Sequence, residues 1–379
     1  MEKELREKLV ALIKREVVPA IGCTEPMAVA LCAAKATEEL GQRPESIEVL
    51  LSANILKNAM GVGIPGTGMV GLHIAAALGA VCGKSEYGLE VLHDLDPKSI
   101  ERAKHLVSEG YVNVVLAETD AKLYVKATVE ASSHDNFCPD LQLKGSKEDN
   151  CHIANAVIQG DHDRFVETAL ADNVLFSSKA DGQGTMDEKS ILDYHLTVKE
   201  IWDFANTVAF DDISFILESR TLNKALAKEG LEGNYGLKVG KTIYDKKFKP
   251  VFGEDFLGYA MAQTAAASDA RMAGCTLPAM SNSGSGNQGI TVTMPVISYS
   301  EKYDVSDEKL ARALVLSHLV AIHIKGYLGK LSALCGCVIA STGSSCGLVY
   351  LEGGGYEELC SAIKNMIGNI TGMVCDGAK

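Results

Sequence analysis

Two long stretches without charge place the strongest constraint on how this chain can fold. Of its 379 residues 22% are charged, yet residues 272–300 and 331–351 contain no charged side chain. Apolar patterns flank the first stretch closely, so it is not a linker. The second is long enough to cross a bilayer, but its Ser, Thr and Gly residues and its isolation favour a buried segment. We therefore expect both stretches to be buried inside a folded protein.

The composition fits a well-packed enzyme and excludes several classes of partner. The chain is 47% hydrophobic, carries a net charge of −13 and has a single Trp, which argues against nucleic acid binding. Its charged, amphipathic N-terminus lacks a signal-peptide core, so we expect a cytoplasmic protein with no membrane partner. Cysteines are normally reduced in that compartment. The eleven cysteines therefore suggest metal binding or catalysis, unless they are simply small buried hydrophobes.

Hydrophobic periodicity predicts an α+β protein, with a mainly helical catalytic part and a small mixed β-sheet inset domain. The length favours two or three domains, and we divide the chain into segments 1–90, 91–180 and 181–379. The expected helices cover about 3–17, 24–40, 69–81, 96–109, 197–206, 211–229, 254–273 and 306–325, and the expected strands about 46–52, 112–118, 123–130, 151–159 and 174–177. His318 and His323 fall on the last, strongly apolar helix, so we expect buried, hydrogen-bonded histidines.

Cys23 is the best single candidate for a reactive cysteine. It lies directly before a predicted helix, with Thr24 as the expected N-cap and Pro26 in the first turn. The positive end of a helix dipole lowers the pKa of a nearby thiol. The alternative is a turn cysteine without chemistry.

Two glycine-rich stretches are candidate carboxylate-binding loops. Four glycines fall within residues 61–68, just before a predicted helix whose N–H groups could meet an anion, although the P-loop and Rossmann spacings are absent. Residues 273–289 combine small hydroxyls, amides and glycines, which suits a small anionic ligand. A plain tight loop and a structural turn, respectively, are the alternatives.

The end of the chain is rich in cysteine. Five of the eleven cysteines follow Lys330, at Cys335, Cys337, Cys346, Cys360 and Cys375. Three thiolates could hold a [4Fe–4S] cluster and leave one iron open as a Lewis acid. No CxxC pair is present, so core packing stays the alternative.

Five motifs taken together carry a family resemblance. They are GCTEP, NxxKN…GIPGTG, SDARMAGC…SNSGSGNQGI, CGCVIASTGSSCG and NMIGNITGMVCDGAK. The chain resembles the serine dehydratase α-chain-like family from about residue 10 to its end, and most closely the L-cysteine desulfidase branch. The resemblance implies a [4Fe–4S] enzyme without pyridoxal phosphate. It would convert L-cysteine to sulfide, ammonia and pyruvate, or L-serine to ammonia and pyruvate.

The resemblance also assigns residues to roles. Cys23 matches the base that removes the Cα proton, and Cys335 (or Cys337) and Cys375 match cluster ligands. The positions that match contacts to the substrate carboxylate are Gly66, Thr67, Gly68, Ser281, Asn282, Ser283, Gly284 and Asn287.

One departure concerns the end of the chain. In the family, the segment resembling CDGAK continues to a further cysteine ligand and a helical tail, whereas this sequence stops at Lys379. We therefore expect either a truncated chain that holds no intact cluster, or substitution by Cys337 or Cys346. A rival hypothesis is a redox or iron-sensing protein that binds a cluster without turnover. A small amino acid is the expected partner, and a homodimer the expected assembly.

Overall fold

The chain forms two compact units. The computed structural model describes residues 2–131, 152–178, 196–328 and 335–371. The helical unit comprises Met1–Gly22 with Met186–Lys379, and the sheet unit is Cys23–Thr185. This division differs from the expected segments 1–90, 91–180 and 181–379, because the strand at residues 46–51 belongs to the same sheet as the strands that follow residue 111.

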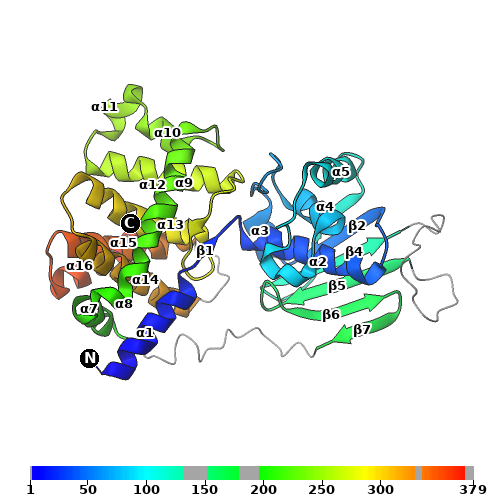
Figure 1. The fold of residues 1–379 in the computed structure, drawn as a ribbon, viewed down its shortest axis with the longest axis horizontal. Coiled ribbons are helices and arrows are strands. Elements are labelled where there is room, and N and C mark those ends of the chain that lie inside the picture. The colour runs from blue at the N-terminus through cyan, green and yellow to red at the C-terminus, as the bar shows by residue number, and fades with distance from the viewer. Residues whose placement is uncertain (1, 132–151, 179–195, 329–334, 372–379) are drawn as a thin grey trace, which may run out of the picture. The chain divides into compact units, whose positions relative to one another are not determined.

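The sheet unit contains a six-stranded mixed sheet and the helices that cover it (Figure 1). Its elements are α2 (Thr24–Leu40), β2 (Ser46–Leu51), α3 (Ala53–Ala59), α4 (Leu72–Cys82), η1 (Ser85–Glu90), α5 (Pro97–Ser108), β3 (Val112–Leu116), β4 (Tyr124–Glu130), β5 (Ile153–Gln159), β6 (Phe165–Leu170) and β7 (Asn173–Ser177). The strand order is β3-β2-β4-β5-β6-β7, with β2 parallel to β3 and every other pair antiparallel.

Alternation along the strands explains how the sheet is covered. In β4, Val125, Ala127 and Val129 are buried while their neighbours are partly buried or exposed, as the two-residue period of a strand requires. Helix α2 packs on β4, β5 and β6 and against α4. Its sequence is rich in alanine, which allows close packing. Gly41 ends α2 in the left-handed conformation, at φ 69°.

The helical unit is built from long helices and one short two-stranded sheet. Its elements are α1 (Lys3–Glu16), β1 (Pro19–Ala20), α7 (Val198–Thr207), α8 (Phe210–Ile213), η2 (Ser214–Leu217), α9 (Glu218–Glu232), α10 (Val239–Tyr244), η3 (Lys246–Phe248), α11 (Lys249–Phe252), α12 (Phe256–Met272), β8 (Ala279–Met280), α13 (Gly286–Lys302), α14 (Asp307–Leu328), α15 (Gly336–Leu351) and α16 (Tyr356–Thr371). Strands β1 and β8 pair antiparallel, with Pro19 opposite Met280.

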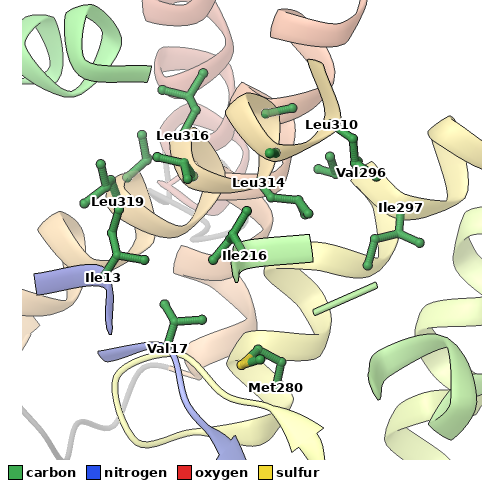
Figure 2. Close-up of a cluster of buried hydrophobic side chains, with 14 of the residues drawn as sticks. Ile13, Val17, Ile216, Met280, Val296, Ile297, Leu310, Leu314, Leu316 and Leu319 are labelled. Atoms are coloured by element: carbon green, nitrogen blue, oxygen red, sulfur yellow. The ribbon is translucent and has the colours of Figure 1, made fainter. Parts of the chain in front are cut away.

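Helix α14 supplies the centre of this unit's core. Leu310, Leu314, Leu316 and Leu319 are fully buried. They lie among side chains from α1, α13 and the β8 region (Figure 2). His318, on the same helix, is also fully buried and hydrogen bonded, which confirms the prediction. His323 is only partly buried and its ring lies edge-on against Tyr327.

The two uncharged stretches form helices that the sequence pattern did not indicate. Helix α13 occupies much of the first stretch and is buried over most of its length. In the second stretch, residues 336–351 form α15, which packs against α13 and α14. Within the described ranges, no helix combines the length and the apolar character that crossing a membrane requires.

Candidate active site

The loop before α13 is held in one conformation by backbone bonds. Asn282 and Ser285 exchange backbone hydrogen bonds of 3.1 and 3.0 Å. Ser285 caps α13 by accepting a bond from the Gln288 N–H at 3.3 Å. Ser281 donates both its N–H and its hydroxyl to Val18 O, at 2.9 and 2.6 Å. The hydroxyl of Ser281 is therefore already used to fix the loop to the chain after α1.

Asn282 stands at the centre of a buried polar chain. Its side-chain N–H donates to His318 Nδ1 at 2.9 Å, and its Oδ1 accepts from Gln288 Nε2 at 2.5 Å. Because Nδ1 accepts, the neutral His318 ring carries its proton on Nε2. Burial lowers the pKa of His318 to about 3, so the ring is neutral at pH 7.

This buried chain has two atoms without partners. His318 Nε2 and Gln288 Oε1 are buried and make no hydrogen bond to any residue that the structure describes. Such atoms are uncommon because they incur a desolvation cost that no bond offsets. Gln288 Oε1 faces Gly336, where a Cβ would lie 2.9 Å from it.

Two of the predicted cluster ligands lie at the start of α15. Cys335 is exposed and occupies the N-cap position, and Cys337 is half-buried in the first turn. The hydroxyl of Thr291, on α13, donates to Cys337 Sγ at 3.5 Å. Burial raises the pKa of Cys337, so its thiol stays protonated in the absence of an electropositive partner. The first two turns of α13 thus bring the serine- and asparagine-rich loop next to these thiols.

Cys346 has a different environment from Cys335 and Cys337. It is fully buried in the hydrophobic core, and burial raises the pKa of its thiol to about 12. The structure therefore does not place Cys346 with the two thiols at the start of α15. Cys375 lies outside the described residues.

The described thiols fit an iron–sulfur cluster only in part. Cys335 and Cys337 have the donor chemistry that such clusters take, and neither is in a disulfide. Among the residues that the structure describes, no group of three His, Cys, Asp or Glu side chains is arranged to hold a metal. A cluster at this position would need at least one further ligand, the role that the resemblance gives to Cys375.

The other predicted site residues belong to the sheet unit. Cys23 is 8% exposed and is itself the N-cap of α2. The sequence predicted Thr24 at the cap, one residue later. The expected position of Cys23 at a helix N-terminus is nevertheless what the structure shows.

The side chain of Thr67 in the glycine-rich loop of the sheet unit forms its hydrogen bonds within that loop. Gly66 and Gly68 both have positive φ, 77° and 68°. The hydroxyl of Thr67 donates to Ile64 O at 2.7 Å and accepts from the Met69 N–H at 3.0 Å. Thr67 is 3% exposed, so the structure gives its side chain a role in shaping the loop.

Comparison with known proteins gives the family. Residues 86–379 match the family described as "Serine dehydratase alpha chain". A UPF0597 protein of Phocaeicola vulgatus is 51% identical over 379 residues, which cover 100% of this chain and 83% of the relative. UPF0597 proteins of Bacteroides fragilis and Aliivibrio fischeri are 50% and 42% identical, and the aligned part covers 84% of each relative. This chain belongs to the serine dehydratase alpha chain family.

The resemblance read from the five motifs is thus confirmed at the level of the family. A serine dehydratase alpha chain is a component of an ammonia-lyase, which supports a lyase role for this chain. The similar UPF0597 proteins carry no activity in their names, so the choice of substrate is a separate question.

Arg271 of this serine dehydratase family chain is a buried residue to which the sequence pattern assigned no role. The residue lies in the last turn of α12 and is only 5% exposed. Its Nη2 donates to Gly22 O at 2.6 Å, and its Nη1 donates to Asn287 Oδ1 at 3.1 Å. The sequence offered one signal for a functional role of Arg271, which is its position as the last charged residue before the uncharged stretch 272–300.

Proposed function

We propose that this protein is an iron–sulfur dependent L-cysteine desulfidase. It would convert L-cysteine and water to sulfide, ammonia and pyruvate. Membership of the serine dehydratase alpha chain family carries the proposal. The thiols at the starts of α2 and α15 support it, because both are in positions where a thiolate or a metal-bound sulfur is stabilised.

In the proposed reaction Cys23 is the base. Its thiolate takes the Cα proton, the electron pair left behind forms the Cα–Cβ double bond, and the β C–S bond breaks to release sulfide. The resulting aminoacrylate tautomerises to an imine, which water hydrolyses to pyruvate and ammonia. Each step conserves atoms and electrons without an external oxidant or reductant.

Cys335, Cys337 and Cys375 would hold the cluster. When bound, a [4Fe–4S] cluster with an open iron supplies a Lewis acid that polarises the substrate and assists the leaving group. The loop residues 281–287 would contact the carboxylate of the substrate. As the proposed base, Cys23 performs the abstraction of the Cα proton.

L-Serine dehydratase is the second candidate, and the name of the family favours it. The reaction is the same except that hydroxide leaves in place of sulfide. Serine and cysteine differ in a single atom, so the same site can accept either. The ratio of kcat/KM for the two substrates decides between them.

The test uses anaerobically reconstituted protein supplied with L-cysteine or L-serine. We expect stoichiometric sulfide and pyruvate from cysteine, with a higher kcat/KM than for serine. A higher kcat/KM for serine would establish the dehydratase instead. A reconstituted cluster with no ammonia release from either amino acid would reject both lyase proposals and favour the sensor hypothesis.

The role of Cys23 gives a first mutational prediction. Cys23→Ala should keep the visible absorbance of the cluster and lose turnover by roughly 10²–10⁴-fold, the usual contribution of a general base. Cys82→Ala is the matched control, because Cys82 is a thiol of the same unit at the opposite, C-terminal end of a helix. Retained turnover in Cys23→Ala would remove Cys23 as the base.

A further inference from the structure

Arg271 is a buried cation for which the described residues provide no anion. The ion pairs of the described residues do not include it, and it donates hydrogen bonds to a backbone carbonyl, an amide oxygen and the sulfur of Met272. Its Nε is buried and has no hydrogen-bond partner in the described parts of the chain. Burying a charge is costly unless an opposite charge accompanies it, so an uncompensated guanidinium indicates a partner that binds from outside the chain.

The surroundings of Arg271 add positive potential. The guanidinium lies against Gly286, the first residue of the 17-residue helix α13, where the N-terminal end of the helix dipole is positive. A Cβ at Gly286 would lie 2.2 Å from Arg271 Nε and 2.6 Å from Cζ, so only glycine permits this approach. Residues 272–300 contain no acidic side chain that could neutralise the guanidinium and the positive end of the helix dipole.

The acidic residue nearest to Arg271 in the sequence is already engaged. Asp269, two residues before Arg271, accepts a bond from the Gly240 N–H at 2.9 Å through its Oδ2. Arg312 provides the contrast within the same unit, because it pairs with Glu308 at 2.8 Å. Both arginines are largely buried, but only Arg312 of the two has an acidic partner among the described residues.

The position of Arg271, on α12 and beside the first turn of α13, fits a small amino acid. Asn287 contacts Arg271, and Thr291, four residues later on the same helix face, contacts Cys337. One helical turn, about 5.4 Å of rise, separates the two positions. A small α-amino acid can therefore extend from the guanidinium toward the thiols.

We propose that Arg271 and the N-terminus of α13 form the binding site for the α-carboxylate of an amino acid. This inference rests on the proposed lyase function for the identity of its ligand. The guanidinium neutralises the carboxylate, and the fixed N–H groups of the first turn of α13 donate to it. Cysteine and serine share this carboxylate, so the site selects α-amino acids and leaves the choice of β-substituent to other residues.

The test measures binding of L-alanine by isothermal titration calorimetry. L-Alanine has the α-carboxylate but no β leaving group, so binding is measured without turnover. We expect the wild-type protein to bind L-alanine and to bind ethylamine, which lacks the carboxylate, at least about 100-fold more weakly. Equal affinity for the two probes, or no binding of L-alanine, would overturn the proposal.

Arg271→Gln should lower the affinity for L-alanine on the order of 100-fold, since it removes the charge. Arg312→Gln is the matched control and should leave that affinity unchanged. If Arg271→Gln does not fold, Arg271→Lys keeps the charge without the planar fork, and we expect about a 10-fold loss. Wild-type affinity in either folded Arg271 variant would overturn the proposal.

The same measurements separate this inference from the proposed function. Binding of L-alanine that depends on Arg271, with no turnover of cysteine or serine, would keep the carboxylate site and reject the lyase. Turnover of L-cysteine with unchanged KM in Arg271→Lys would keep the lyase and reject the carboxylate site.

Discussion

The two glycine-rich stretches look alike in sequence but differ in how their polar groups are used. In the loop 61–71 of the sheet unit, the hydroxyl of Thr67 bonds within the loop. The Ile64 N–H donates to Met69 O, and the Gly71 N–H donates to Val62 O. Around the start of α13, Gln288 Oε1, His318 Nε2 and Arg271 Nε are buried and have no hydrogen-bond partner among the residues that the structure describes. A stretch whose polar groups bond to one another has a structural role. A stretch that leaves buried polar groups without hydrogen bonds is a candidate ligand site.

The largest expected effect tests the close packing around α13. A Cβ at Gly289 would lie 2.0 Å from the backbone oxygen of Met280, which β1–β8 pairing holds in place. Gly289→Ala should therefore lower the free energy of unfolding by about 3 kcal/mol, as measured by urea denaturation. A loss below about 1 kcal/mol would mean that α13 and β8 can separate readily, against the picture of a rigid site.

An intermediate effect tests the buried polar chain through its pH dependence. The pKa of His318 is lowered by burial to about 3, from an ordinary value of 6.5. The unfolded chain therefore binds a proton that the folded protein rejects. The stabilising contribution of the neutral ring is complete above pH 6.5 and is lost as the pH falls toward 3.

At pH 5.5 this loss should amount to about 1.4 kcal/mol relative to pH 8. Urea denaturation of the wild type and of His318→Gln at the two pH values measures this loss of stability, because the variant has no titrating ring at position 318. His93→Gln, which alters an exposed ring, is the control and should behave as wild type. An unchanged pH dependence in His318→Gln would show that the ring is accessible to protons in the folded state.

The smallest effect is expected in the loop of the sheet unit. Gly68 has φ 68°, and a Cβ there would meet nothing within 4 Å. Gly68→Ala should therefore cost only the strain of a left-handed alanine, about 1 kcal/mol after the gain from a less flexible unfolded chain. Thermal denaturation checks this, and a loss as large as that of Gly289→Ala would cancel the distinction between the two stretches.

Local signals were sufficient to predict much of the secondary structure. Asp96 and Pro97 predicted the start of α5, and the structure shows Asp96 accepting bonds from the N–H groups of Lys98 and Ser99. Helices α1, α2, α7, α12 and α14 and strands β2 and β4 also lie close to their predicted positions. Caps, alternation and apolar periodicity are properties of a few neighbouring residues and can be read from sequence.

Helices α13 and α15 depend on tertiary packing, and their sequences contain no local pattern that predicts a helix. Helix α13 contains Pro295 and several β-branched residues, all poor helix formers. In α15, a Cβ at Gly343 would lie 2.4 Å from Ser317 O of α14, so its glycines serve close contact between helices. Arg271 was missed for a related reason, because a charged residue is expected at the surface and only the fold shows that it is buried.

The insertion of the sheet unit also bears on how the chain folds. The helical unit combines two separate segments of the chain, and β1 at Pro19–Ala20 pairs with β8 at Ala279–Met280 across the insertion. The sheet unit is one continuous segment. Closing a long chain segment costs entropy before the distant contacts can form. During synthesis the sheet unit emerges complete before residue 279, so its early folding would shorten the effective loop that β1 and β8 must close.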